Sequence, residues 1–228
     1  NPDNTIFDAD AADHLAISVL GTSLIEGIRF QNISGYHSVN IGSAADDVSI
    51  RVRNNAFVGV NVDFKNRQDP DGESTSGLFA RFINNRINGF PGSVGTPIAL
   101  DIAGASHVRV VGNTIADNIG IGMRLCANDD IIVSNNIAWN NTSGDIRIFD
   151  DCSGDDEPGD VQLKSNMFGN VIANPVGDSS NNFPGTNPVF ANPGSGNYRL
   201  QNSSPAINAG TISGNQASVD LAGNPRVI

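Results

Sequence analysis

Positive charge, methionine and tryptophan are all scarce in this chain. Its 228 residues include 13 Lys and Arg against 24 Asp and Glu, which gives a formal net charge of −11. An acidic surface repels nucleic acid phosphates and anionic lipid headgroups, so we expect neither as a partner. Only 2 Met and 1 Trp occur, whereas Gly reaches 25. Few long helix formers and many turn formers predict a β-rich chain with frequent corners.

Several segments and motifs are missing as well. No apolar run approaches the roughly 20 residues that a membrane-spanning helix needs, so we expect no membrane span. The chain contains neither a Gly-x-Ser-x-Gly turn nor a Gly-rich phosphate-binding loop. Two common arrangements of esterase and nucleotide chemistry are therefore excluded. The chain begins with Asn1 rather than Met, so we expect a processed start or a piece of a longer protein.

A short phrase recurs along the chain, and it is the strongest internal signal. Each copy is an alternating apolar stretch followed by Asn, any residue, and Ile or Phe: IRVRNNAF, ARFINNRI, VRVVGNTI, DIIVSNNI and VQLKSNMF. The asparagines follow one another at 30, 28, 22 and 31 residues and are Asn55, Asn85, Asn113, Asn135 and Asn166. A degenerate earlier copy, GIRFQNI, covers residues 27–33. Turn chemistry explains some asparagines, but not their fixed place before Ile or Phe.

A second short alternating strand lies between these phrases, with the copies VNI, VNV, LDI, MRL and IRI. Short strands at this period predict an all-β, right-handed parallel β-helix, a solenoid with coils of 22 to 31 residues. The asparagines then form a ladder at one corner. We expect residues 1–170 to form the coils and residues 171–228 a C-terminal coil and cap. The leucine spacing of a leucine-rich repeat is missing, and a β-sandwich would not repeat its strands as phrases.

The C-terminal region carries a family resemblance. Residues 187–210, NPVFANPGSGNYRLQNSSPAINAG, and residues 220–226, DLAGNPR, resemble the ending of many bacterial secreted β-helix proteins with the pectate-lyase-like fold. The resemblance implies an extracellular or cell-surface protein that acts on or near polysaccharides. It implies no single reaction, because the family includes lyases, epimerases and adhesins. The family ending usually continues into an Asp-Ile-Gly-Ala segment, whereas this chain stops at Ile228.

The chain departs from the catalytic patterns of this family. The paired-Asp signatures of the β-helix polygalacturonases, with their Gly-His-Gly and Arg-Ile-Lys segments, are absent. The lysine and calcium-binding aspartates of the pectate lyases are not found either. A uronate lyase needs a base and a cation that stabilises an enolate. The spacing of the residues singles out none of the candidates, which are Arg51, Arg81, Arg109, His107 and Lys65.

An arginine column is the most informative group of polar residues. Alignment of the phrases puts four arginines at the same outward position in consecutive coils: Arg29, Arg51, Arg81 and Arg109. Guanidinium groups one strand apart repel one another unless anions lie between them. A carboxylated sugar chain supplies such anions, because Arg binds carboxylate in a bidentate manner. The alternative is that nearby Asp and Glu side chains neutralise the column.

Two acidic groups are candidate calcium sites. The first is the loop around Asp69 and Asp71, where carboxylates alternate about a glycine turn. The second is formed by aspartates that we expect on the corners of adjacent coils, Asp129, Asp130, Asp150 and Asp151. The alternative for both is a solvated acidic edge without a bound ion.

Two further pairings are predicted between neighbouring coils. Cys126 and Cys152 both follow the second strand of their coils, so neighbouring corners bring them within reach of a disulfide, although two reduced thiols remain the alternative. On the second strand, the outward column is Asn40, Asn61, Asp101, Arg124 and Arg147. We expect Asp101 and Arg124 to form a surface ion pair of little energetic value.

Three functions follow from this sequence. The first is an extracellular protein that binds acidic polysaccharide through the arginines. The second is a lyase or epimerase that acts on the same class of substrate. The third is a non-catalytic structural or adhesive surface protein within a larger assembly.

Overall fold

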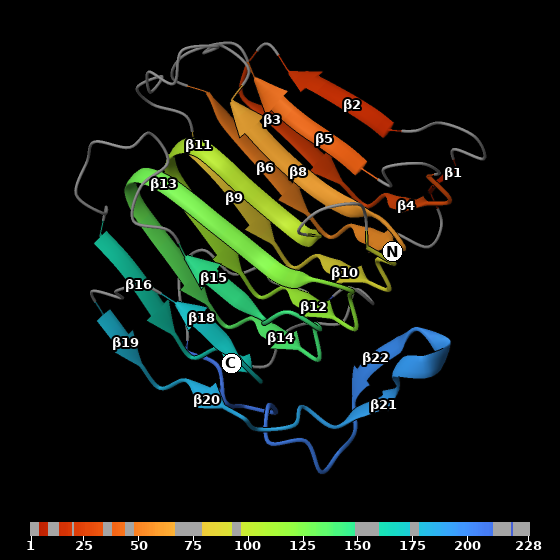
Figure 1. The fold of residues 1–228 in the computed structure, drawn as a ribbon, viewed down its shortest axis with the longest axis vertical. Helices are drawn as coiled ribbons and strands as arrows, with labels where there is room; N and C mark the ends of the chain where they lie inside the picture. The colour runs from red at the N-terminus through yellow and green to blue at the C-terminus, as the bar shows by residue number, and fades with distance from the viewer. Residues whose placement is uncertain are drawn as a thin grey trace.

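The computed structural model describes residues 5–8, 14–19, 21–33, 38–43, 48–66, 79–92, 97–148, 160–173, 178–211 and 220. Most of the described chain is β-strand, and the strands stack in parallel round a common core, as Figure 1 shows. The prediction of an all-β parallel solenoid is therefore confirmed. No described segment forms a helix long and apolar enough to cross a membrane.

One wall of the solenoid is an 8-stranded parallel sheet built from one short strand of each coil. Most of its strands directly follow the corner at which the sequence phrases place their asparagine. In spatial order they are β1 (Ile6–Asp8), β4 (Arg29–Gln31), β7 (Ala56–Val58), β10 (Arg86–Asn88), β12 (Thr114–Ala116), β14 (Ile137–Trp139), β17 (Met167–Phe168) and β20 (Phe183–Pro184).

The other two walls belong to a 12-stranded sheet with two arms. The first arm contains β2 (His14–Val19), β5 (Ser38–Ser43), β8 (Asn61–Asn66), β15 (Ile146–Ile148) and β18 (Val171–Ala173). The second contains β3 (Ser23–Glu26), β6 (Ser49–Arg53), β9 (Phe79–Ile83), β16 (Asp160–Lys164) and β19 (Asp178–Ser180). β11 (Ile98–Val111) and β13 (Ile121–Ser134) run through both arms, and their register shifts between Ile102 and His107, where the wall bends.

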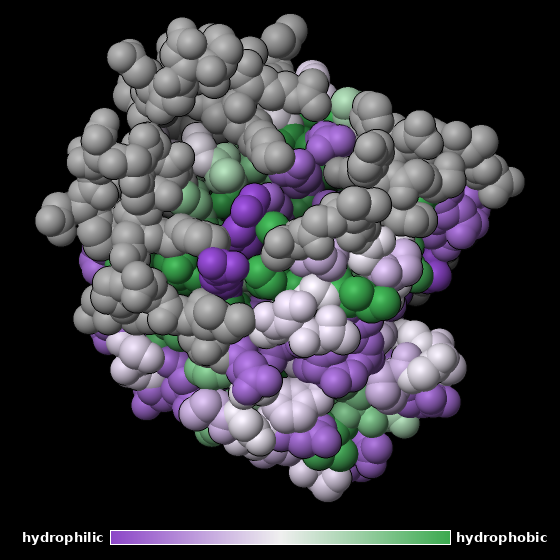
Figure 2. Space-filling view, viewed as in Figure 1, coloured by the Kyte–Doolittle hydropathy of each residue, from purple (hydrophilic) through white to green (hydrophobic). Residues whose placement is uncertain are grey.

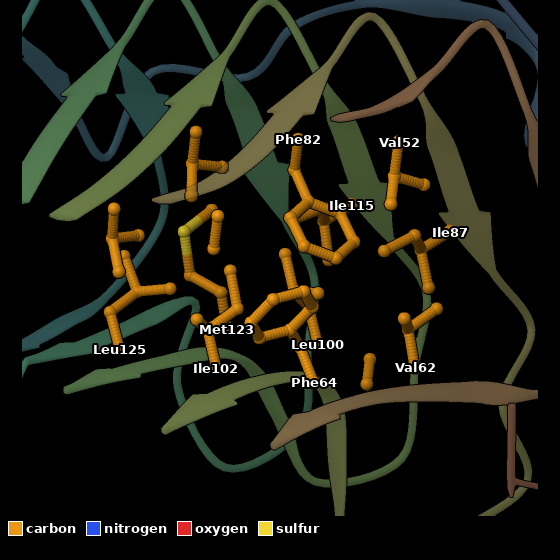
Figure 3. Packing of buried hydrophobic residues seen from close by; sticks show 14 of the residues in the cluster. Val52, Val62, Phe64, Phe82, Ile87, Leu100, Ile102, Ile115, Met123 and Leu125 are labelled. Atoms are coloured by element: carbon orange, nitrogen blue, oxygen red, sulfur yellow. The ribbon is translucent and has the colours of Figure 1, made fainter. Parts of the chain in front are cut away.

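The core is a continuous stack of apolar side chains from all three walls. Phe30 and Phe57 stack face to face with ring centroids 4.9 Å apart, and Phe64 meets Phe82 edge to face at 5.9 Å. Figure 3 shows Val52, Ile87 and Leu100 among the labelled residues that converge on the interior. Each fully buried side chain of this size contributes about 1.5–3 kcal/mol. The outer face seen in Figure 2 instead mixes strongly hydrophilic with hydrophobic residues.

A ladder of hydrogen-bonded asparagines connects successive coils at the corner that precedes the 8-stranded sheet, as predicted. The Oδ1 atom of Asn85 accepts hydrogen bonds from the backbone N and the Nδ2 of Asn55, at 3.0 and 3.2 Å. The Nδ2 of Asn85 donates to the carbonyl oxygen of Val52 at 2.8 Å. The same pattern repeats through the members Asn113, Asn136, Asn166 and Asn182. Every amide of this buried corner thus bonds the coil beside it.

One member of the ladder differs from the prediction, because Asn136 and not Asn135 occupies it. Asn135 has a φ of 57°, the left-handed turn conformation that Asn54 and Asn84 adopt at the same position of their coils. Asn tolerates this conformation better than most residues. The residues Asn135, Asn136 and Ile137 match the phrase, but the ladder uses Asn136, so Ala138 takes the place of the Ile or Phe and pairs with Ile115 and Phe168.

A second ladder, which the sequence interpretation missed, lies at the next corner. The Oδ1 of Asn141 accepts from the Nδ2 of Asn118 at 2.8 Å, and Asn141 donates from its Nδ2 to Asp145 at 2.7 Å. Asp145 is buried, and its Oδ2 accepts from the backbone N atoms of Gly169 and Asn170 at 2.7 and 2.9 Å. A buried carboxylate with four donors therefore ends this ladder.

The described C-terminal residues turn away from the stacking direction and cover part of the solenoid. β21 (Phe190–Asn192), the 3-10 helix η2 (Pro193–Ser195) and β22 (Asn197–Leu200) form an antiparallel hairpin. The Tyr198 hydroxyl donates to Asp117 at 2.8 Å, and the Asn135 amide exchanges two hydrogen bonds with the Thr211 backbone. Figure 1 places β21 and β22 beside the 8-stranded sheet.

Candidate functional site

The candidate site is the outer face of β6, β9, the second half of β11 and the second half of β13, which we call the arginine face. Strand alternation produces it, because successive side chains point to opposite sides of a sheet. In β6, Ile50 and Val52 are fully buried while Arg51 is exposed. In β9 and β11, the same alternation turns Arg81 and Arg109 outward between buried neighbours.

Three of the four predicted arginines stack in register. Arg51 pairs with Arg81 on the next coil, and Arg81 pairs with Arg109 on the one after it. The following coils place Ile132 and Gln162 in this column. The arginines therefore stack over three consecutive coils. The column ends at β13, where Ile132 takes the place of an arginine.

The prediction for Arg29 is wrong in its placement. Arg29 lies on β4, in the 8-stranded sheet, where it pairs with Ile6 and Ala56. The backbone N of Ile28 donates to the Oδ1 of Asn55 at 3.0 Å, so Ile28 occupies the ladder corner of its coil. Arg29 thus follows the corner, whereas the other three arginines precede it. Leu24 takes the place of Arg29 in the column.

A second column runs beside the arginines and contains an aromatic stack. Ser49, Phe79, His107 and Asp130 lie in register on four successive coils. The Arg81 guanidinium bonds the Ser49 hydroxyl and lies over the Phe79 ring, 5.1 Å from its centroid. The His107 ring stacks on Phe79 with centroids 4.3 Å apart and an interplanar angle of 20°. Because Ser49 and His107 flank Phe79, the guanidinium and the imidazole lie on opposite faces of the phenyl ring.

Asp130 joins the two columns. Its Oδ1 bonds the Nδ1 of His107, and its Oδ2 pairs with the guanidinium of Arg109. The side chains of His107, Asp130 and Arg109 are 29%, 24% and 21% exposed, so the group is half-buried and reachable from solvent. Asp130 therefore neutralises one arginine of the column and orients the imidazole.

Arg51 and Arg81, the other two arginines of the column, leave positive charge on the arginine face. Within the described part of the chain, neither Arg51 nor Arg81 forms an ion pair with a carboxylate, since Glu26 pairs with Arg53 at 2.8 Å. Partial burial, followed by the charges of Arg51 and Arg109, lowers the pKa of the Arg81 guanidinium. The hydrogen bond from Arg53 is the main cause that lowers the pKa of the Glu26 carboxyl, and the charge of Arg51 adds a smaller effect without a described ion pair between Arg51 and Glu26. Among the residues that the structure describes, the carboxylates thus do not provide a counterion for every arginine of this face.

The first arm of the 12-stranded sheet holds the predicted pair of Asp101 and Arg124. The Arg124 Nε donates to the Oδ1 of Asp101 at 2.7 Å, and its Nη2 bonds the other oxygen. The prediction of a surface pair needs correction, because the Asp101 side chain is only 8% exposed. Asp63, rather than Asn61, shares this column, since Leu100 pairs with Val62. A shift of two residues keeps the same face outward, so alternation alone does not distinguish the registers.

The calcium prediction falls mostly outside the described residues. Asp69, Asp71, Asp150 and Asp151 lie there, as does the side chain of Asp129. Asp130 is described and uses its oxygens for His107 and Arg109. Among the described residues, no group of three His, Cys, Asp or Glu is placed to hold a metal ion. Calcium at the acidic loops stays a prediction.

The disulfide prediction involves one described cysteine. Cys126 is buried within β13, and Cys152 lies outside the described residues. Their pairing stays a prediction.

The functional group that sequence reasoning missed is the contact of His107 with Asp130. The predicted alignment of Asn113 with Asn135 places Asp130 opposite Val108, one residue away from its true partner His107. The signal that would have found the contact is the second asparagine, Asn136, which restores the correct register. Comparison with family models, with curated proteins and with solved structures gives no match.

Proposed function

We propose that this chain is an extracellular β-helix protein that interacts with an acidic polysaccharide through the arginine face. The observation that carries the proposal is the register of Arg51 and Arg81 on adjacent coils, with no carboxylate ion pair to either within the described residues. Guanidinium groups recognise carboxylates through two parallel hydrogen bonds. Partial burial is the main cause that lowers the pKa of the Arg81 guanidinium, and bound uronate carboxylates would relieve the repulsion from Arg51 and Arg109 that adds to it.

The repeating geometry supports a polymer rather than a single small anion. Strands of neighbouring coils lie about 4.8 Å apart, so the column presents cations at a regular interval along the solenoid. A chain that carries a carboxylate on each sugar engages several of them at once. Each further contact is then intramolecular and raises the overall affinity.

The C-terminal residues support the proposed extracellular location. Residues 187–210 resemble the ending of secreted bacterial β-helix proteins of the pectate-lyase-like fold. Many of these proteins act on or near polysaccharides. The formal net charge of −11 leaves the stacked arginines of the arginine face as a local exception on an acidic chain. Secretion and the glycan class rest on this resemblance together with the arginine face.

Bond cleavage by a lyase is the catalytic form of this proposal. A uronate lyase needs a base beside the sugar and a cation that stabilises negative charge on the carboxylate. The arginine face carries His107 next to Asp130, and Arg81 on the other side of Phe79. Both required kinds of group thus occur on one surface.

A non-catalytic structural or adhesive role is the second candidate, and one observation favours it. Arg109 already pairs with Asp130 inside the chain, so part of the column is neutralised without any ligand. Ion pairs of this kind link the outward side chains of adjacent coils. A solenoid stabilised in this way offers a rigid, extended surface on which other proteins can assemble.

The test compares two variants with the same change in charge. Arg51→Gln with Arg81→Gln removes two cations from the arginine face, and Arg147→Gln with Arg199→Gln removes two from β15 and β22. Binding is measured against polygalacturonate, alginate and a neutral glucan, with calcium and then with chelator. We expect the first variant to lose at least about tenfold in affinity for an acidic glycan and the control to lose little. Equal binding by both variants, or no binding of any acidic glycan by the parent chain, would overturn the proposal.

A further inference from the structure

We propose that the arginine face is a bounded site, which takes a short run of anionic groups over three coils and no negative charge beyond that run. This inference rests on the proposed function, because it requires that an acidic glycan lie on the arginine face. It narrows the ligand to glycans whose anionic sugars occur in short blocks between neutral sugars. It also assigns the residues that end the site on each side.

The cationic part of the face is short. Arg51, Arg81 and Arg109 lie in register on β6, β9 and β11. Strands of neighbouring coils lie about 4.8 Å apart, so the first and the last of these arginines are separated by about 10 Å along the solenoid. Arg53, the other arginine of β6, pairs with Glu26 at 2.8 Å. A glycan that runs along the solenoid therefore meets the cations of this column over about 10 Å.

The column is apolar on both sides of the arginines. Leu24 precedes Arg51 on β3 and is 51% exposed. Ile132 follows Arg109 on β13 and is half-buried. Neither side chain can donate a hydrogen bond. An anionic group at either position would lose hydration without gaining a polar partner from the column, whereas a neutral sugar loses much less.

The strands that follow β11 carry carboxylates on the same outer surface. Asp130 on β13 is in register with Asp160 on β16, and Asp160 is exposed. Asp178 on β19 is in register with Gln162. Its side chain is 51% exposed, although it pairs with Lys164 at 2.6 Å. Like charges repel one another, so a uniformly charged polyanion gains contacts over β6 to β11 and meets repulsion over β13 to β19.

These boundaries predict how affinity depends on the length of a fully charged glycan. Once the first anionic sugar is bound, each further contact with an arginine is intramolecular, so affinity rises steeply with the first few sugars. Beyond the last arginine, an additional anionic sugar finds no cation in the column, and the affinity stops rising. A column without these ends would instead gain affinity with every sugar.

The test measures affinity against chain length. Oligogalacturonates of two to eight sugars, and long polygalacturonate, are titrated into the parent chain and two variants by calorimetry at low salt. Ile132→Arg with Gln162→Arg places arginines in the next two coils of the same column. Ala16→Arg with Asn202→Arg is the control, because it adds the same charge at two exposed positions on β2 and in the turn after β22.

We expect the affinity of the parent chain to rise up to about four sugars and then to change by less than about fivefold up to eight. The two added arginines should raise the ratio of octamer to trimer affinity at least about fivefold over the parent chain. The control should leave this ratio within about twofold of the parent value.

A parent affinity that keeps rising more than about twofold with each sugar from four to eight overturns this inference and leaves the proposed function standing. Binding of long polygalacturonate without binding of any oligomer has the same meaning. A ratio that the extended column raises no more than the control does also overturns the inference. Failure to bind any acidic glycan removes both the inference and the proposed function. The parent series decides by itself if a variant fails to fold.

Discussion

Asp145 takes the place of an asparagine at the end of the second ladder and binds Asn141 through the same pair of hydrogen bonds that one asparagine offers the next. Its Oδ1 accepts from the backbone N and the Nδ2 of Asn141, at 3.1 and 2.7 Å. Its second oxygen bonds the backbone of the following coil, which an asparagine amide nitrogen at that position would not do. The carboxylate thus links Asn141 directly to the backbone of Gly169 and Asn170 on the following coil.

This arrangement predicts a large effect of one isosteric change. Asp145→Asn presents a nitrogen donor to the backbone N–H groups of Gly169 and Asn170, so two partly buried donors lose their acceptor. We expect a loss of about 2–4 kcal/mol in the free energy of unfolding, measured by urea denaturation. Asp178→Asn, at an exposed position, is the control and should change stability by less than about 0.5 kcal/mol. Equal effects of the two changes would contradict the buried network.

The register of the first ladder can be tested with a pair of asparagines. Asn136→Ala removes the buried amide that links Asn113 to Asn166, and we expect it to cost about 2–4 kcal/mol. Asn181→Gly changes an exposed asparagine with a φ of 54°, which glycine adopts readily, so stability should change by a few tenths of a kcal/mol. Thermal or urea unfolding of both variants gives the comparison. A smaller loss for Asn136→Ala than for Asn181→Gly would place the ladder elsewhere.

The C-terminal hairpin predicts an alkaline dependence of stability. Burial, followed by the hydrogen bond to Asp117, raises the pKa of the Tyr198 phenol above its ordinary value. A raised pKa in the folded chain means that this stabilisation is complete below the unfolded pKa of about 10 and is lost as the pH rises further. We expect Tyr198→Phe to lower stability by about 1 kcal/mol at neutral pH and by less at strongly alkaline pH. A difference that stays constant with pH would contradict the hydrogen bond from this half-buried phenol to Asp117.

The cysteines give a prediction that does not depend on any ligand. If Cys126 and Cys152 are joined, thiol titration in denaturant detects no thiol before reduction and both afterwards. Replacement of both by serine should then cost about 3 kcal/mol of stability under oxidising conditions. Two titratable thiols in protein that was never reduced would exclude the disulfide.

Much of the candidate site could be predicted from the sequence because it depends on alternation within single strands. Arg51, Arg81 and Arg109 each lie between two apolar residues, and a half-buried strand leaves them no other direction than outward. The pairing of Asp101 with Arg124 follows from the same argument applied to the neighbouring wall. These are local properties, and the fold preserves them whatever the lengths of the loops.

Placement relative to the corners was less predictable. Arg29 has the same local pattern as the other arginines, yet it lies after the turn at Gly27 and so faces outward from another wall. Nothing in the strand itself distinguishes the two positions. The difference depends on which residue enters the ladder corner, and there Ile28 takes the place that asparagine takes elsewhere.

The sequence by itself determined that this chain is a stacked parallel solenoid with arginines on its outer surface, because repetition and a period of two are visible in the order of residues. Only the tertiary structure decided which residues of adjacent coils meet. Coils differ in length, and a shift of one residue exchanges the inner and outer faces of a strand, so register depends on the core and both ladders together. That register brings Asp130 to His107, and it turns a column of arginines into a candidate site for chemistry.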